Sequence, residues 1–374
     1  MDWDVSQMIP LGDNSMLNII LQLMFYAFFI VFLFYGQRIQ LYISIRDVEG
    51  SLRKLRFMRD EGRRIAIEAV KSIGKPKEDI TARVNDFIDY VSISPVDMDP
   101  SGIVWKLEHL LDVRDNRFKE DVRLMAPEAD DTQINNLENV LEAAMALNFI
   151  YKYIRHFYIL GRKTLSYYII LQLQMLLPLI MREAEAYGRA LTALTTGQPI
   201  GDGIGALVAA KLMNKYEKRE IAKDTVVAEA PIDGRIAYIL KAKGPGGNVG
   251  KPGEGIMRIL EEKKGKVSSV IMVDAGLKFE GENVGDISEG VGAAIGGPGV
   301  EKFKVEEITF KYKVPVQAII VKEDVGDAIS TMRKELVEAA DKAIERIRRL
   351  INEKTSHGDS VIIAGIGNTI GIAQ

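Results

Sequence analysis

The feature that most constrains this 374-residue chain is an uncharged apolar run near its N-terminus. Residues 16–35 read MLNIILQLMFYAFFIVFLFY, with only Asn18 and Gln22 as polar interruptions. At about 1.5 Å per residue, a helix of this length crosses a hydrocarbon core of about 30 Å. A cleaved signal peptide is disfavoured because the preceding residues include three aspartates and no Lys or Arg. We therefore expect one N-terminal transmembrane helix rather than a helix buried in a core.

Basic residues begin only after this run. Residues 1–37 contain no Lys or Arg, whereas residues 38–64 contain eight. This asymmetry predicts a single-pass protein of the cell membrane, with its N-terminus outside and its C-terminal domain cytoplasmic. The same basic cluster would attract anionic headgroups, so the lipid bilayer is an expected partner. A net charge of −3 argues against a dedicated nucleic-acid binder.

A second uncharged run lies in the helical middle of the chain. Residues 164–181 read TLSYYIILQLQMLLPLIM and are compatible with a second membrane span, a helix buried on all sides, or the core of a homo-oligomer. We favour burial, because Gln172, Gln174 and Pro178 weaken membrane insertion and basic residues flank both ends.

The segment 197–205, GQPIGDGIG, leads into another predicted helix. Free backbone N–H groups at such a helix start can hold an anion. The favoured interpretation is instead that the Asp202 side chain caps the helix.

The pattern changes from Thr225 onward, where apolar strands alternate with helices. Such an alternation predicts a Rossmann-like parallel sheet covered on both faces, so the fold class is α/β with a helical N-terminal part. The expected regions are a tail and transmembrane helix (1–40), a juxtamembrane helical region (41–125), an apolar helical domain (126–220) and a glycine-rich α/β domain (221–374).

Glycine is concentrated in that last domain, since 15 of the 33 glycines lie between Gly244 and Gly299. Glycine-rich or charged segments follow four predicted strands, and ligands bind at the carboxyl edge of open α/β sheets. Consecutive N–H groups there can form an anion-binding nest. The predicted site for a nucleotide or another small anionic ligand comprises Gly244, Gly246, Gly247, Lys251, Asp274, Lys278, Gly296, Gly297, Gly299, Gly365, Gly367 and Asn368. The alternative is that these glycines only form long turns.

Within this predicted site, Lys251 and Lys278 are the expected phosphate partners. Asp274 and Glu280 could hold a divalent metal, because hard cations prefer carboxylate ligands, so a nucleotide with Mg²⁺ is the cofactor considered. Glu282 is a further candidate partner of Asp274 for acid–base chemistry. The chain has no cysteine and three scattered histidines, which excludes cysteine nucleophiles and histidine-rich metal sites. Whether the protein is an enzyme is left open.

Several segments together resemble one family. These are PIGDGIG, KGPGGNVGKPGEGI, VDAGLKFEGE, GVGAAIGGPGVEKFKVEE and GDSVIIAGIGNTIGI, together with the N-terminal apolar run. They resemble the uncharacterised archaeal membrane proteins grouped as domain of unknown function 1512. The resemblance implies an archaeal source and a single-pass membrane protein, but no reaction.

Three functions are consistent with these patterns. The first is a membrane-anchored sensor or enzyme whose α/β domain binds a nucleotide or phosphorylated small molecule. The second is an oligomeric scaffold without catalytic activity. The third is a transporter or channel subunit with a second span at 164–181.

Overall fold

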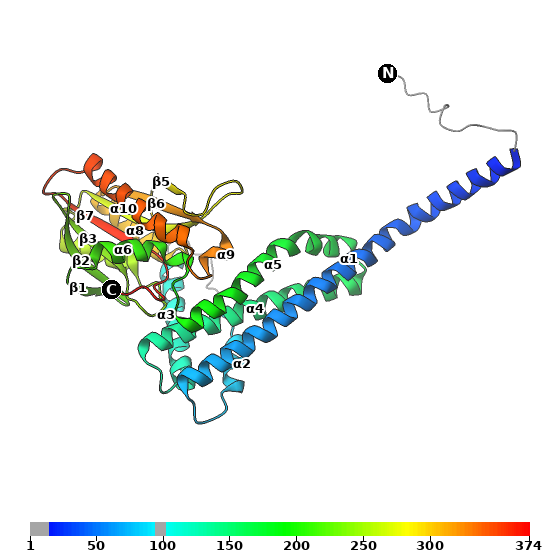
Figure 1. The fold of residues 1–374 in the computed structure, drawn as a ribbon, viewed down its shortest axis with the longest axis horizontal. Helices are drawn as coiled ribbons and strands as arrows, with labels where there is room; N and C mark the ends of the chain where they lie inside the picture. The colour runs from blue at the N-terminus through cyan, green and yellow to red at the C-terminus, as the bar shows by residue number, and fades with distance from the viewer. Residues whose placement is uncertain (1–14, 94–101) are drawn as a thin grey trace, which may run out of the picture. The chain divides into compact units, whose positions relative to one another are not determined.

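The computed structural model describes residues 15–93 and 102–374, which form two compact units (Figure 1). The described part of unit 1 comprises residues 15–54 and 152–179. The described part of unit 2 comprises residues 55–93, 102–151 and 180–374. Residues 1–14, which include the three N-terminal aspartates, and residues 94–101 lie outside the described residues.

The N-terminal half of the described chain is helical. It contains α1 (Ser15–Gly74), α2 (Thr81–Ile88), α3 (Ile103–Met125), α4 (Asp131–Thr164) and α5 (Tyr167–Thr196). Unit 1 contains the first part of α1, the end of α4 and the start of α5. Its interior includes Val48 and Ile170, and Gln174 donates a hydrogen bond to Asp47 at 3.2 Å.

The apolar N-terminal part of α1 is exposed. Phe25 is 65% and Phe28 is 68% exposed, whereas Leu41 further along the helix is buried. Within the described stretches of the chain, no helix is long and apolar enough to cross a membrane, so neither the expected transmembrane helix nor the alternative of a second span at 164–181 is found.

Helix α5 differs from the expected helix buried on all sides. Leu173 and Leu177 are buried, but Tyr168 is 78% and Met175 is 70% exposed. The burial interpretation is therefore wrong for one face of the helix, because neighbouring helices cover only the opposite face.

Unit 2 contains a seven-stranded sheet with the order β1-β2-β3-β7-β4-β6-β5. The strands are β1 (Lys218–Ala222), β2 (Thr225–Ile232), β3 (Arg235–Ala242), β4 (Ser269–Leu277), β5 (Ile287–Val291), β6 (Val316–Glu323) and β7 (Ser360–Gly365). The central strands β3, β7, β4 and β6 are parallel, as expected.

The prediction of a parallel sheet is wrong for the outer strands, which makes the sheet mixed. Strands β1 and β5 are antiparallel to their neighbours, and β2 is antiparallel to both β1 and β3. The reason lies in the connections, because only Asp233 and Gly234 separate β2 from β3, and parallel strands need a far longer crossover. Both residues have positive φ, as a tight hairpin turn requires.

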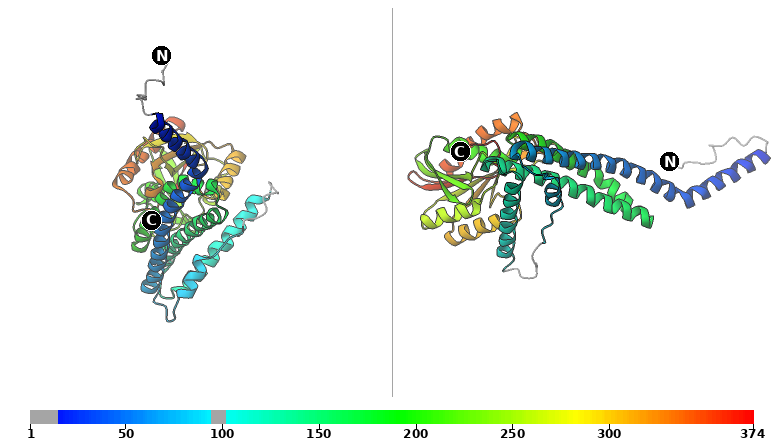
Figure 2. Two further views of the ribbon diagram at one scale, coloured as in Figure 1. Left: turned by 90° about the vertical axis from the view of Figure 1, so that its right-hand side faces the viewer. Right: turned by 90° about the horizontal axis from the view of Figure 1, so that it is seen from below.

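Helices cover both faces of the sheet. Helices α6 (Ile204–Met213) and α10 (Lys334–Lys354) pack on one face through Val208, Leu336 and Ile347. Helices α7 (Pro252–Glu262) and α8 (Val300–Tyr312) pack on the other face, where they lie side by side in yellow-green and gold (Figure 2, right). A short 3-10 turn, η2 (Gly201–Gly203), leads into α6, and a short helix, α9 (Val325–Ala328), follows β6.

The connections place a crevice at one edge of the sheet. After β4 the chain forms the edge strand β5 and then α8 on one face, whereas after β6 it forms the short α9 and then α10 on the opposite face. Neighbouring strands whose connections leave on opposite faces open a crevice at their carboxyl ends, where α/β proteins bind ligands. The prediction that four strands end at one edge is confirmed by the parallel pairing of β3, β7, β4 and β6.

Candidate functional site

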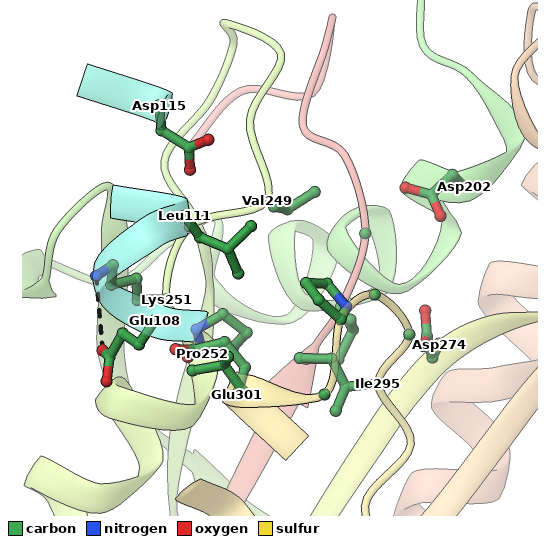
Figure 3. A pocket seen from close by; sticks show the side chains of 18 of the residues that line it. Glu108, Leu111, Asp115, Asp202, Val249, Lys251, Pro252, Asp274, Ile295 and Glu301 are labelled. Atoms are coloured by element: carbon green, nitrogen blue, oxygen red, sulfur yellow. Dashed lines mark ion pairs between the residues drawn. The ribbon is translucent and has the colours of Figure 1, made fainter. Parts of the chain in front are cut away.

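A cavity of about 370 Å³ lies at this carboxyl edge (Figure 3). Its walls come from α3, the loop before α7, the end of β4, the loop before α8, the turn η2 and the segment after β7. Its polar lining includes Asp202 and Asp274, and its apolar lining includes Leu111, Val249 and Ile295. Ligand cavities are typically of this size and combine an apolar wall with a few polar groups.

Asp274 lies at the end of β4 and is 8% exposed. Its carboxylate accepts hydrogen bonds from the backbone N–H groups of Ala275, at 2.8 Å, and Gly296. Burial and the nearby negative charge of Asp202 outweigh these hydrogen bonds and raise the pKa of Asp274 to about 7. This carboxyl can therefore take up or release a proton near neutral pH.

Asp202 lines the same cavity from η2. Its side chain does not cap α6, contrary to the expectation, and Gly203 occupies the N-cap position without a side-chain hydrogen bond. The carboxylate instead accepts the backbone N–H of Asn368 at 2.8 Å. Burial raises the pKa of Asp202, and the Asn368 N–H only partly opposes that effect. The half-buried Asp202 and the buried Asp274 thus line the same cavity, and we call them the aspartate pair.

A third carboxyl, Glu323 at the end of β6, is buried behind this pair and is 1% exposed. Within the described part of the chain, its Oε2 atom has no hydrogen-bond partner. Burial and repulsion from Asp202, Asp327 and Asp274 raise the pKa of Glu323 to about 8. Because Asp202, Asp274 and Glu323 repel one another when charged, the three carboxyls do not all ionise together near neutral pH.

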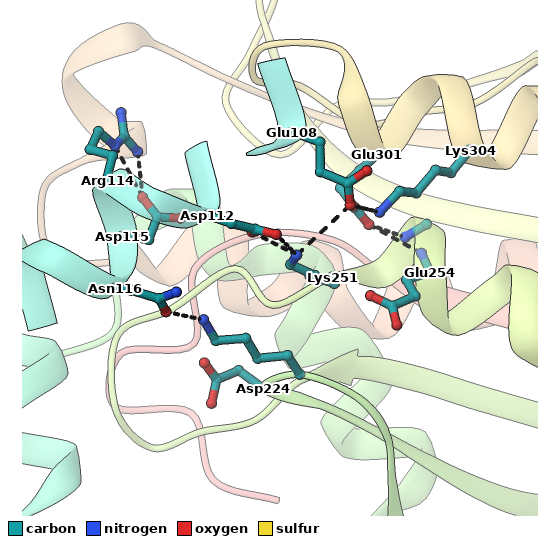
Figure 4. A network of polar contacts seen from close by, with 12 residues as sticks. Glu108, Asp112, Arg114, Asp115, Asn116, Asp224, Lys251, Glu254, Glu301 and Lys304 are labelled. Atoms are coloured by element: carbon teal, nitrogen blue, oxygen red, sulfur yellow. Dashed lines mark hydrogen bonds and ion pairs between the residues drawn. The ribbon is translucent and has the colours of Figure 1, made fainter. Parts of the chain in front are cut away.

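The opposite wall of the cavity is an ion-pair network between α3 and the α/β elements (Figure 4). Lys251 donates to both carboxylate oxygens of Asp112, at 2.7 and 2.9 Å. Lys304 of α8 is 4% exposed and donates to Glu108 and Glu301. Burial lowers the pKa of Lys304, but these carboxylates outweigh it and leave that pKa raised.

The N-terminus of α7 is occupied by a side chain of the protein itself. Glu301 accepts the backbone N–H groups of Gly253, at 2.7 Å, and Glu254, at 3.2 Å. A Cβ atom on residue 253 would lie 2.4 Å from the Glu301 carbonyl oxygen, so glycine is required for this approach. Lys251, one of the two lysines expected to bind phosphate, is also paired, so both this lysine and the N-terminus of α7 are satisfied internally.

Several predicted residues line the main cavity together. They are Lys251, Asp274, Gly296, Gly297, Gly299 and Gly367. Gly247 and Asn368 instead line a second cavity, and Gly365 packs against the backbone of Gly205. Gly244 packs against the C-terminal segment, and Gly246 packs against α4.

The predicted metal pair is not supported by the arrangement of its residues. Neither Lys278 nor Glu280 is among the residues that line the main cavity. Glu280 is 87% exposed and forms an ion pair with Arg182. Across residues 15–93 and 102–374, no group of three or more His, Cys, Asp or Glu side chains is arranged to hold a metal ion. Glu282, the other suggested partner of Asp274, pairs with Lys322.

Sequence reasoning missed the contribution of the N-terminal helices to this site. Glu108, Asp112 and Asp115 of α3 line the main cavity, although α3 lies far from the glycine-rich domain in the sequence. Acidic residues spaced three and four apart mark one face of α3, which is the only local signal for this role.

The fold and the cavity define an α/β protein with the aspartate pair at the carboxyl edge of a mixed sheet. The chain belongs to the DUF1512 family of unknown function: residues 22–197 match its N-terminal domain and residues 200–373 match its C-terminal domain. A comparison with curated proteins finds no match.

Proposed function

We propose that the aspartate pair carries out general acid–base hydrolysis of an amide bond in a substrate bound in the main cavity. The supporting observation is that Asp202 and Asp274 line one cavity and that the charge of Asp202 helps to raise the pKa of Asp274 to about 7. Because the two charges repel each other, the second carboxyl ionises only near neutral pH, which leaves one acid and one base in the same cavity, as general acid–base catalysis requires.

In the proposed reaction, the ionised member of the pair takes a proton from water as the water oxygen bonds to the carbonyl carbon. The protonated member donates its proton to the carbonyl oxygen, which gives a gem-diol. The member that took the water proton then passes it to the leaving nitrogen, while the other member takes back a proton from the gem-diol, and the C–N bond breaks to give an amine and a carboxylic acid. Asp274 is suited to hold the exchangeable proton, because its pKa lies near neutrality.

The charge of the cavity weighs against the nucleotide or phosphate ligand suggested by the sequence. The lining contains six carboxylates, namely Glu108, Asp112, Asp115, Asp202, Asp274 and Glu301. Its two cations, Lys251 and Arg114, are paired with Asp112 and Asp115. The acidic groups of the lining therefore outnumber its cations, and both cations are already paired, which disfavours a phosphate relative to a neutral or cationic substrate.

The test is turnover of a mixed pool of peptides in ¹⁸O-labelled water, read by mass spectrometry. The full-length protein should release fragments with ¹⁸O in the new carboxyl group, and Asp202→Asn and Asp274→Asn should each abolish this release. The matched control is Glu280→Gln, which changes an exposed carboxyl and should retain turnover. Turnover by both Asp→Asn variants equal to that of the native chain would refute the proposal. Cleavage of glycosides but not of peptides would also refute it.

We further propose that unit 1 contacts a lipid bilayer and keeps the protein at the cell membrane. The support is the exposed apolar surface of α1 between Met16 and Phe32, together with Tyr168 and Met175 of α5. The basic residues that follow from Arg38 onward suit anionic headgroups.

Flotation with phosphatidylcholine vesicles, with and without phosphatidylserine, tests this second proposal. The full chain should float with the vesicles, and more strongly when phosphatidylserine is present. The triple variant Phe25→Ser, Phe28→Ser and Phe29→Ser should stay at the bottom of the gradient. Flotation of the variant equal to that of the native chain would refute the role of this surface in membrane binding. Homo-oligomerisation that buries this surface without vesicle binding would favour the scaffold alternative.

A further inference from the structure

A second cavity of about 230 Å³ adjoins the main cavity. The two cavities share a wall formed by Asp112, Arg114, Asp115, Val249, Gly250 and Lys251. The second cavity is also lined by Glu138, Asn139 and Glu142 of α4 and by Asn248 and Asn368. A substrate that reaches the aspartate pair could therefore extend a side group into this second space.

Most charged groups around the second cavity already have partners. Lys251 pairs with Asp112, Arg114 with Asp115, and Lys119 with Asp224, all within 2.9 Å. The remaining cation, Lys223, donates to the side-chain oxygen of Asn116 at 2.7 Å. The cations lining this cavity are thus engaged with other groups of the protein.

Two carboxyls are the exception. Glu138 and Glu142 lie one turn apart on α4, and no hydrogen bond or ion pair joins either side chain to another residue of the described chain. They face Asp115, Arg114 and Lys119 across the cavity, and each cation is closer to its own partner. Burial and the charge of Glu142 raise the pKa of Glu138 to about 8, and burial raises the pKa of Glu142.

A separate observation points to a missing donor. The side-chain oxygen Oδ1 of Asn248, a residue that lines the same cavity, is buried and accepts no hydrogen bond within the described residues. Buried acceptors without donors are costly, and such groups in a cavity mark a place where a ligand with several donors gains affinity.

We propose that the second cavity binds the guanidinium or ammonium group of the substrate, so that the amide substrate of the aspartate pair is a basic peptide. Glu138, Glu142 and the Asn248 oxygen supply acceptors only, and a guanidinium supplies five N–H donors and a positive charge. A metal ion is a poorer fit, because the described residues contain no group of three or more metal-ligating side chains in a suitable arrangement. This inference rests on the hydrolytic function proposed above.

Calorimetric titration of the full chain at pH 7 with N-acetylargininamide, and with its neutral counterpart N-acetylcitrullinamide, tests the inference. The arginine probe should bind about tenfold or more tightly than the citrulline probe. Because Glu138 holds a proton at pH 7 in the empty cavity, binding of the cation should release a proton. That release appears as a binding heat that varies with the ionisation enthalpy of the buffer.

Isosteric variants separate this role from a structural one. Glu138→Gln and Glu142→Gln should each weaken the arginine probe about tenfold. Glu138→Gln should also abolish the proton release. The control Glu185→Gln, at an exposed position of α5, should change neither quantity. Asp274→Asn should bind the probe normally while losing hydrolysis, so failure of the hydrolytic proposal and failure of this subsite give different results.

The inference is overturned if both probes bind equally, if the arginine probe binds without proton release, or if Glu138→Gln and Glu142→Gln bind it as tightly as the native chain. Binding of Mg²⁺ in competition with the arginine probe would also overturn it, because the cavity would then be a metal site. Melting temperatures of the Gln variants that match the native chain would show that weaker binding is not caused by loss of the fold.

Discussion

The carboxylate of Asp202 accepts a 2.8 Å hydrogen bond from the backbone N–H of Asn368, which lies 166 residues further along the chain. This contact ties the turn before α6 to the segment after β7. It places Asp202 beside the end of β4, where its negative charge acts on Asp274. The relationship explains why a residue that looks like a helix cap in the sequence belongs to the cavity in the fold.

Asp274→Asn should remove a pH dependence of stability. The pKa of Asp274 is about 7 in the folded chain, well above its ordinary value of 3.8, so the folded state binds the proton more tightly than the unfolded state. Stability therefore falls as pH rises from about 4 to about 7, by at most about 1.4 kcal/mol per pH unit. Thermal unfolding across this range should show a flatter profile for Asp274→Asn than for the native chain. The exposed variant Glu280→Gln should keep the native slope, and a native slope in Asp274→Asn would contradict the prediction.

Glu323→Gln should stabilise the protein at alkaline pH. The pKa of Glu323 is raised to about 8, so its ionisation costs stability as pH rises from about 4.5 to about 8. A glutamine keeps the shape and cannot ionise, so its melting temperature should exceed that of the native chain at pH 9 and match it at pH 4. Glu261→Gln, exposed on α7, is the control. An unchanged melting temperature of Glu323→Gln at pH 9 would show that Glu323 ionises without cost.

Removing one member of the Lys304–Glu108 pair should destabilise the fold. Lys304 is 4% exposed, and Glu108→Gln leaves it with Glu301 as its remaining carboxylate partner. Loss of one partner of a buried ion pair costs about 3–5 kcal/mol when no other partner remains, so a smaller cost of about 2 kcal/mol is expected here. Urea unfolding measures this cost, and the double variant Glu108→Leu with Lys304→Met should recover part of it. If the double variant lost as much stability as Glu108→Leu and Lys304→Met lose separately when added together, the two residues would have independent roles.

Gly205→Ala should be strongly destabilising. A Cβ atom at this position would lie 2.2 Å from the Val273 carbonyl oxygen and 2.3 Å from the Ile366 carbonyl oxygen. Helix α6 would have to move off the sheet, and overpacking of this kind costs about 1–3 kcal/mol or more. Gly290→Ala is the matched control, because nothing lies within 4 Å of its added Cβ. Equal urea midpoints for both variants would mean that α6 does not pack this closely.

The sequence contains clear signals for the central strands of the sheet and for the edge at which they end. Solidly apolar segments such as Ser269–Val273 and Ser360–Ala364 distinguish buried parallel strands. Strand β5 could not be recognised in this way, because it reads ISEGV and is half-buried or exposed throughout. The Asp233–Gly234 turn did signal an antiparallel hairpin, and its two-residue length overrides the α/β alternation around it.

The site was only partly accessible to sequence reasoning. The loops around Asp274 and Gly296 are marked by strand ends and glycines, which are local patterns. The role of Asp202 depends on the distant Asn368, and the wall formed by Glu108 depends on the docking of α3 against α8. The contact of Asp202 leaves no periodic pattern in the chain, and the spacing of the acidic residues on α3 does not show where that face docks. Likewise, Lys251 looked like a free phosphate partner until the fold placed Asp112 beside it.

The most direct test of the aspartate pair is the titration of Asp274, followed by ¹³C NMR of the side-chain carboxyl carbons in the full chain and in Asp202→Asn. The proposed acid–base site predicts that Asp274 in the native chain titrates near pH 7. Because the charge of Asp202 contributes to that value, Asp202→Asn should lower the pKa of Asp274. A native Asp274 that titrates near its ordinary value of 3.8, with no change in Asp202→Asn, would contradict the raised pKa on which the proposed hydrolysis depends.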